Sequence, residues 1–490
     1  MLEAVALVFL RSLFVTALVR AAWPATVEWP GFVAEWGRVA RFVAIVAVAL
    51  LPFAVLAFAT AVTALSWLFF VSVPVLVMAA MLVHPGVVSA SWWRDRPAWD
   101  TVRVVLLAFV LLTAAGAVLS AVPTWAQPPV AALAGLGDAW CWLHIVQARA
   151  GVAPQRRRRP FVVVALAGIV VLVVGGTAAG FAVSIAVQNG RTPVAPERAS
   201  ATGPPVLIVK GFNSEWDGIT RQWVHGRYRI RRFSYAGLDA HGAPRPYGRA
   251  DTHQSLPALA QELRTQVDAF RAATGQPVSI VAESEGALVA LAYVAATPHA
   301  PVPAVIALSP LLVPGRVYYP TVGDAGWGTV SGTVLDGLAR ALSGVGPVDV
   351  SADTGLFRSF VDKGPALQGL LRCAPPGRRS LAVIPLDSGV ASPAPVTIGL
   401  PHVVVPAFHG GLLGDHTTAG LIDDVLAGRP TSASGFWAGT GDVVGALAAG
   451  WQAPGLATGL EPAWRSLPSP SDCAGVRASI SQWVNGAGGR

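Results

Sequence analysis

The sequence predicts a helical, multi-span membrane region followed by an α/β domain with a mainly parallel sheet. Three observations lead to this prediction. Of the 490 residues, 53% are hydrophobic and only 13% are charged, which is unusual for a wholly soluble protein. Long apolar segments fill much of residues 1–187. From residue 205 onward, short β-rich runs alternate with helical stretches, which indicates parallel strands covered by helices on both faces.

The apolar segments near the N-terminus are long enough for five or six membrane spans. Roughly 20 apolar residues cross the hydrocarbon core of a bilayer. Residues 1–22 are apolar but contain Arg11 and Arg20, so they form either a sixth span or a helix in the interface. The lipid bilayer is therefore an expected partner, and the cell membrane is the expected location. The five other spans are expected at residues 40–60, 64–83, 103–123, 128–147 and 161–187.

The arginines predict the orientation of these spans. Twelve arginines and six acids in residues 1–190 account for +6 of the net charge of +8. The basic excess thus lies between apolar segments and does not indicate a nucleic-acid partner. Arg156 to Arg159 directly precede the last span. With five spans, all arginine-bearing connections fall on the cytoplasmic side, and the chain leaves the last span on the extracytoplasmic face.

A polar, proline-containing linker at residues 188–204 precedes the α/β domain at residues 205–490. The period of the apolar residues distinguishes strands from helices in this domain. Helices are expected at residues 251–270, 286–296 and 417–428, and strands at residues 205–212, 228–237, 278–284, 303–310, 380–387 and 402–409.

The strongest chemical signal is Ala282-Glu283-Ser284-Glu285-Gly286, which stands between a buried strand and a helix. It resembles the nucleophile elbow of the α/β-hydrolase superfamily, where a strained turn exposes a serine hydroxyl above the sheet. Small residues are needed two positions either side of the serine, because neighbouring backbone passes close there. Gly286 fits this rule, and Ala282 replaces the usual glycine by the next smallest residue. Ser284 is therefore the expected nucleophile.

The resemblance implies a base and an orienting acid in the chain order Ser, Asp, His. Two expected strands end at Asp387 and near His409, which would place both residues at the carboxyl edge of the sheet. VVVPAFHGGLLGDH is similar to the histidine loop of bacterial lipases and esterases, so His409 is the expected base. His416 is the alternative base and Asp415 the alternative acid. Asp387 could instead start a turn.

Acyl transfer also requires hydrogen-bond donors for the developing oxyanion. The resemblance assigns one donor to the backbone N–H after the nucleophile, here that of Glu285. The other donor comes from the loop after an early strand, where this sequence has Lys210-Gly211-Phe212. The Phe212 N–H is the candidate. The family often has His-Gly at this point, so Lys210 departs from the family pattern.

Residues 311–372 are too many for a simple connection between two core strands. The resemblance implies a lid over the serine, and a crossover helix with a long loop is the alternative. Cys373 and Cys473 are expected to form a disulfide on the oxidising outer face, with two separate buried thiols as the alternative. The three cysteines lack metal-ligand spacing, so no metal and no other cofactor are expected.

The segment from residue 233 to 256, followed by the elbow, is similar to membrane-anchored, esterase- or lipase-like α/β-hydrolases of actinobacterial type. The prediction is a membrane-anchored extracytoplasmic serine hydrolase that cleaves carboxylic esters, of a lipid or another acyl compound, through an acyl-enzyme. An acyltransferase using the same residues is an alternative. A transporter accessory domain and a non-catalytic binding module are others. The joint presence of Ser284, Asp387 and His409 argues against the binding module.

Overall fold

The computed structural model divides into two compact units. The N-terminal unit comprises residues 1–183 and 446–454, and the C-terminal unit residues 184–445 and 455–490. The predicted boundary at residues 187 and 188 lies outside the residues that the structure describes. Those residues are 2–23, 25, 28–29, 31–44, 99–150, 202–219, 227–311, 354–387, 398–409, 411–431, 435–440, 442 and 472–487.

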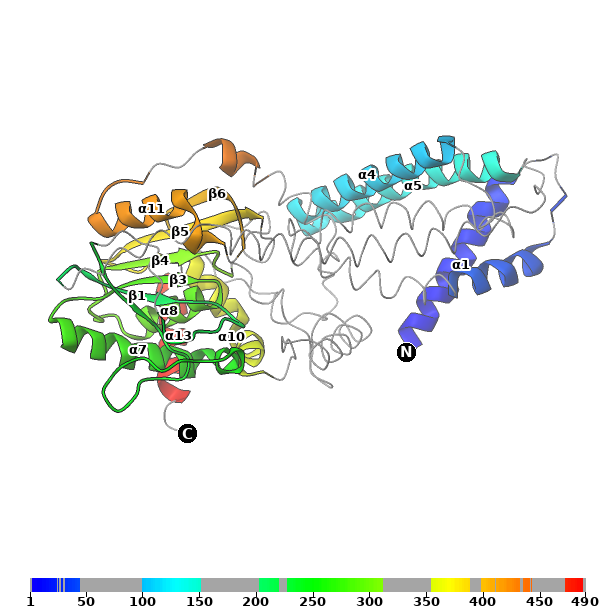
Figure 1. The fold of residues 1–490 in the computed structure, drawn as a ribbon. Coiled ribbons are helices and arrows are strands. Elements are labelled where there is room, and N and C mark those ends of the chain that lie inside the picture. Colours follow the sequence, from blue (N-terminus) through cyan, green and yellow to red (C-terminus); the bar gives the residue numbers. More distant parts are fainter. Residues whose placement is uncertain are drawn as a thin grey trace. The chain divides into compact units, whose positions relative to one another are not determined.

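The N-terminal unit is helical in its described part. Helices α4 (Trp99–Ala121) and α5 (Gln127–Ala150) are joined by the short 3-10 turn η2 (Thr124–Ala126) and pack against each other (Figure 1). Helix α1 (Leu2–Ala22) packs against α5. Three of the segments predicted as spans are thus helical over most of their length.

Formation of a helix does not by itself show that a segment crosses a membrane. Among the residues described here, no helix combines the length and the apolar character needed to cross a bilayer. The predicted spans at residues 64–83 and 161–187, and nearly all of the span at 40–60, lie outside the described residues.

The C-terminal unit contains a parallel sheet in which the strand order is β2-β1-β3-β4-β5-β6. Every neighbouring pair is parallel. The connections after β1 and after β3 leave in opposite directions, so the switch point of the sheet lies at the carboxyl ends of these two strands. The bounds are Pro205–Val209 for β1, Arg229–Arg232 for β2, Ser279–Glu283 for β3, Ala304–Leu308 for β4, Arg379–Asp387 for β5 and His402–Phe408 for β6.

Helices cover both faces of this sheet (Figure 1). Helices α7 (Leu256–Thr274), α8 (Glu285–Ala296), α10 (Gly355–Arg372) and α13 (Cys473–Ala487) pack on one face, and α11 (His416–Ala427) packs on the other. Alternation along each strand produces the two cores. Ile280 and Ala282 point into the first core, and Val281 points into the second.

The predicted lid is wrong for its last part, residues 355–372. This segment forms α10, whose side chains Leu356, Phe360 and Leu367 are buried in the core. The helix packs against α7, α8 and α13. Its apolar face therefore completes a layer on the sheet, as the alternative of a crossover helix requires. Residues 312–353 of the predicted lid lie outside the described residues.

The helix expected from residue 251 begins later than predicted. Residues Arg249–His253 form the 3-10 turn η3, and α7 begins at Leu256 after Ser255. Pro257 lies in the first turn of α7, where its missing N–H leaves no helical hydrogen bond unmade. The residues of η3 therefore lie outside the helix and can contact the loop that follows β1.

A disulfide joins Cys373, at the end of α10, to Cys473, at the start of α13. Their Cα atoms are 5.5 Å apart, and 100 residues separate them in the sequence. Ile480 and Val484 on α13 are buried in the core. The disulfide therefore ties the last helix to the layer that covers one face of the sheet.

We expect that replacing both Cys373 and Cys473 by alanine lowers the free energy of unfolding of the C-terminal unit by about 2–5 kcal/mol, since the cross-link restricts the unfolded chain. The measurement is the urea concentration at which this unit of the full chain becomes sensitive to protease. Cys141→Ala, a change in the N-terminal unit, is the control and should leave that concentration unchanged. Equal urea resistance of the double variant and the native chain, both non-reduced, would contradict the prediction.

Candidate active site

Ser284 occupies the turn between β3 and α8 with φ 56° and ψ −119°. A positive φ is uncommon for a residue with a side chain and is retained only where the surroundings enforce it. The Ser284 N–H donates to the Leu308 carbonyl at 2.8 Å, and α8 begins at Glu285. A strained turn between a strand and a helix is therefore present at the position predicted for the elbow, and the role of Ser284 as nucleophile stays a prediction.

Two glycines allow the loop after β1 to lie directly against this turn. A Cβ on Gly286 would lie 2.5 Å from the Lys210 carbonyl oxygen and 2.8 Å from the Val209 carbonyl oxygen. A Cβ on Gly211 would lie 2.8 Å from the Ser284 Cβ. Backbone thus contacts backbone here, which is the physical reason for a small residue at position 286.

The structure brings Ser284 and His409 together. The Ser284 Oγ and the His409 Nε2 are 2.9 Å apart, within hydrogen-bonding distance. His409 directly follows β6, and Phe408 pairs in register with Asp387, the last residue of β5. The backbone of Asp387 is therefore next to the strand that carries the histidine. The role of Asp387 as the orienting acid stays a prediction.

The alternative acid, Asp415, and the alternative base, His416, both lie at the start of α11. The Asp415 carboxylate accepts hydrogen bonds from the Thr418 N–H at 2.8 Å and from the Thr418 Oγ1 at 3.0 Å. Asp415 is thus the N-cap of α11. His416 is the first residue of the helix and is exposed. The geometry therefore favours His409 over His416 as the partner of Ser284.

Burial lowers the pKa of His409, and the negative charge of Glu283 acts in the opposite direction. A lowered pKa favours the neutral imidazole, the form that accepts a proton from a serine. The imidazole of His409 therefore stays neutral down to a lower pH than that of an unperturbed histidine.

A partly buried ion pair that the sequence prediction missed lies beside Ser284. The Lys210 Nζ is 2.6 Å from the Glu283 Oε2, and the Glu283 side chain is only 4% exposed. The Tyr235 hydroxyl donates to the Lys210 carbonyl at 2.5 Å. Strand alternation could have indicated the pair, since Lys210 and Glu283 each follow by two positions a residue of the same core, Ile208 and Val281.

The turn η3 holds the loop that contains Phe212. The Phe212 ring stacks on His253 with 4.7 Å between ring centroids. The Asn213 N–H donates to the Thr252 Oγ1 at 2.9 Å, and the Asn213 Oδ1 is 2.8 Å from the His253 Nε2. These contacts fix the backbone that touches Ser284. The Phe212 N–H as an oxyanion donor stays a prediction.

Glu285 contributes to the site through its backbone. Its N–H belongs to the first turn of α8, where the helix provides no carbonyl partner, so it suits the predicted donor role. Its side chain is fully buried, and neither carboxyl oxygen has a hydrogen-bond partner in the described part of the chain. Burial raises the pKa of this carboxyl well above its usual range, which favours the neutral acid.

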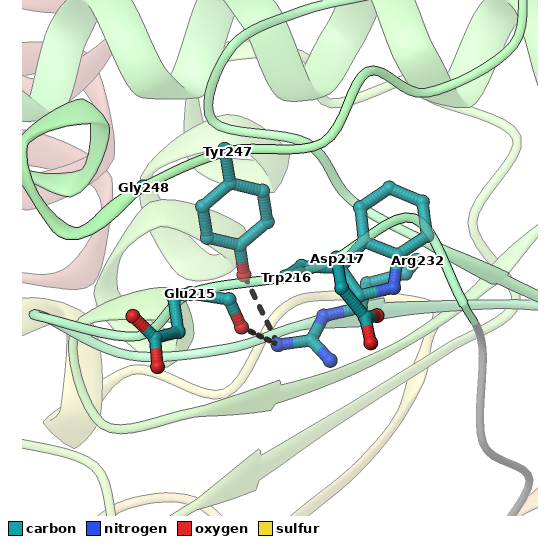
Figure 2. A pocket seen from close by; sticks show the side chains of 6 residues that line it. All are labelled: Glu215, Trp216, Asp217, Arg232, Tyr247 and Gly248. Carbon is teal, nitrogen blue, oxygen red and sulfur yellow. Dashed lines mark hydrogen bonds between the residues drawn. The ribbon is translucent and has the colours of Figure 1, made fainter.

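A cavity of about 380 Å³ lies between the loop after β1 and the carboxyl end of β2, at the edge of the sheet that carries Ser284 (Figure 2). The Arg232 Nη2 donates to the Tyr247 hydroxyl and to the Glu215 carbonyl, each at 3.2 Å. The lining combines charged side chains with the aromatic rings of Trp216 and Tyr247. The lining residues are Glu215, Trp216, Asp217, Arg232, Tyr247 and Gly248.

Metal ligands do not converge in the described ranges. There, no group of three or more His, Cys, Asp or Glu side chains could hold a metal ion.

No protein-family model matches the chain, and no curated protein sequence does. A proline iminopeptidase-related protein from Thermus thermophilus is 15% identical, with 47% of this chain and 91% of that chain covered and a TM-score of 0.28. Lipase B from Aspergillus fumigatus is 13% identical, with 57% and 69% covered and a TM-score of 0.26.

Similarity at these TM-scores carries no argument about activity. The strand order, the helices on both faces and the strained serine turn are features of the chain itself. The C-terminal unit has an α/β-hydrolase-like sheet.

We expect Gly286→Ala to slow the reaction of Ser284 with a fluorophosphonate at least about tenfold and to lower the free energy of unfolding by about 1–3 kcal/mol, because the added methyl forces two backbone segments apart. Both quantities are measured on the full chain. Gly420→Ala is the matched control, since Gly420 is exposed on α11 and its Cβ would meet open space. Native-like reaction rates in Gly286→Ala would show that the close approach is unimportant.

Proposed function

We propose that the C-terminal unit is a serine hydrolase that cleaves carboxylic esters through an acyl-enzyme. The observation that carries this proposal is the 2.9 Å contact between the Ser284 Oγ and the His409 Nε2 at a strained turn. A serine hydroxyl is a weak nucleophile at neutral pH and needs an adjacent base. A buried histidine whose pKa is lowered is such a base.

In the proposed reaction, the His409 Nε2 takes the proton of Ser284 as its Oγ attacks the ester carbonyl carbon. The carbonyl oxygen becomes an oxyanion, which the backbone N–H groups of Glu285 and Phe212 are suited to stabilise. His409 then gives the proton to the leaving alcohol, and the serine ester remains. Water attacks this ester in the same way, with His409 again as base and then acid, which releases the carboxylic acid and restores Ser284.

The proposed substrate is an ester of a lipid or another acyl compound, and one feature supports this class. The apolar N-terminal sequence would keep the unit close to lipid. Asp387 is the proposed orienting acid for His409.

We also propose that the N-terminal unit anchors the protein in the cell membrane, with the C-terminal unit on the extracytoplasmic side. Apolar side chains on α1, α4 and α5 point outward, and Phe14, Val110 and Leu133 are each more than 60% exposed. Surfaces of this kind need an apolar cover, which lipid supplies. The disulfide between Cys373 and Cys473 accords with an oxidising compartment.

The hydrolase proposal predicts that a fluorophosphonate labels the full chain and that labelling disappears in Ser284→Ala. In His409→Ala, the labelling rate should fall by about 100-fold or more, because general-base assistance contributes about 10²–10⁴. Ser388→Ala, a serine outside the proposed machinery, is the control and should be labelled like the native chain. Undiminished labelling of Ser284→Ala would place the reactive serine elsewhere.

The anchoring proposal predicts the activity of reporter fusions in a bacterial host. Alkaline phosphatase, which needs an oxidising compartment, should be active when fused after residue 204 and inactive when fused after Arg159, because the arginines before the last span stay in the cytoplasm. β-Galactosidase at the same two positions is the control, with the opposite pattern expected. Active alkaline phosphatase at Arg159 and inactive enzyme at residue 204 would reverse the proposed orientation.

A further inference from the structure

One face of the sheet ends in charged residues around the nucleophile. Ile208, Val281 and Ala407 all point into the core that α11 covers. Because side chains alternate along a strand, the residues two positions further on continue on that face. These residues are Lys210, Glu283 and His409.

The ion pair with Lys210 satisfies only one of the two carboxylate oxygens of Glu283. Glu283 is only 3% exposed, and its Oε2 lies 2.6 Å from the Lys210 Nζ. Its Oε1 is buried and has no hydrogen-bond partner in the part of the chain that the structure describes. An unsatisfied buried carboxylate oxygen is costly and calls for an explanation. Stability alone does not supply one, since a buried ion pair is often no better than a well-packed apolar pair.

Charged residues stand at the ends of four elements at this edge of the sheet. Glu283 ends β3, and Lys210 follows β1. Asp387 ends β5, where its backbone pairs with Phe408. Asp415 stands before α11, where its carboxylate caps the helix. The negative charge of Glu283 acts on His409 and favours its protonated form.

We propose that Glu283 is a positioning residue of the proposed hydrolase, whose carboxylate stabilises the imidazolium that His409 becomes when Ser284 gives up its proton. Lys210 compensates the carboxylate while the imidazole is neutral. The inference rests on the proposed function, in which this proton transfer occurs twice, once for acylation and once for deacylation. It also accounts for the lysine at the position where the family often has histidine.

The first test reads the charge of His409 without any catalysis. The full chain contains nine histidines, so ¹³Cε1-labelled histidine yields a spectrum simple enough to titrate, and His409→Asn identifies the signal. In Glu283→Gln, the pKa of His409 should fall by about 0.5–1 unit, since loss of a nearby negative charge disfavours the imidazolium. An unchanged or raised pKa in the folded variant overturns the proposal.

The matched control is Glu262→Gln, which removes the same charge from α7, where the Glu262 Oε1 accepts a hydrogen bond from Gln266 at 2.8 Å. It should leave the pKa of His409 unchanged. If Glu283→Gln does not fold, the double variant Lys210→Met, Glu283→Gln replaces it, because it leaves no unpaired charge. The pKa of His409 should fall in the double variant too, by a smaller amount. A pKa equal to that of the native chain there overturns the proposal.

The second test measures the fluorophosphonate labelling rate and ester hydrolysis against pH. In Glu283→Gln, the acid limb should move to lower pH with the pKa of His409, and the plateau rate should fall about 3- to 10-fold, as expected for one pKa unit or less. A native pH profile, despite a shifted pKa, overturns the positioning role. A native chain that neither labels nor hydrolyses refutes the hydrolase proposal, and the titration then still decides whether Glu283 acts on His409.

Discussion

Gly286 packs directly against the carbonyl oxygens of Val209 and Lys210, and no side chain fits between them. This contact joins the first turn of α8 to the end of β1, at the point where the connections of the sheet diverge. It holds Ser284 against Gly211 and leaves the serine turn in a conformation that a free chain rarely adopts. The strand order, the strained turn and the adjacent loop therefore depend on one another.

Burial favours the neutral forms of two ionisable groups near Ser284. Desolvation lowers the pKa of His409 and raises that of Glu285, so both groups are favoured in their neutral forms. The charged groups of Lys210 and Glu283, which lie beside Ser284, are 2.6 Å apart and compensate each other. In the proposed reaction, this pair responds when His409 becomes charged.

Local patterns were sufficient to predict the strands and the elbow. Short apolar runs bounded by turns identified β1, β3, β4, β5 and β6, because a strand buried on both faces needs nearly continuous apolar residues. The edge strand β2 is only half-buried and carries three arginines, and it lies within the longer segment 228–237 predicted as a strand. The start of α7 and the nature of α10 were mispredicted for a different reason. Residues 355–372 have an apolar face that would suit a lid as well as a core helix. Only the packing of α10 on α8 and α13, which lie far away in the sequence, decided between them.

The sequence by itself determined that an α/β domain follows an apolar region, and that a serine stands between a buried strand and a helix with a glycine two positions later. These features depend on residues that are neighbours in the chain. The resemblance indicated His409 as the partner of that serine and left His416 open; tertiary structure decided between them and alone revealed the Lys210–Glu283 pair. Ser284 and His409 are 125 residues apart in the sequence, and Lys210 and Glu283 are 73 residues apart. Such pairs form because parallel strands present their carboxyl ends at one edge, and the order of strands in a sheet is set by long-range packing that no local pattern encodes.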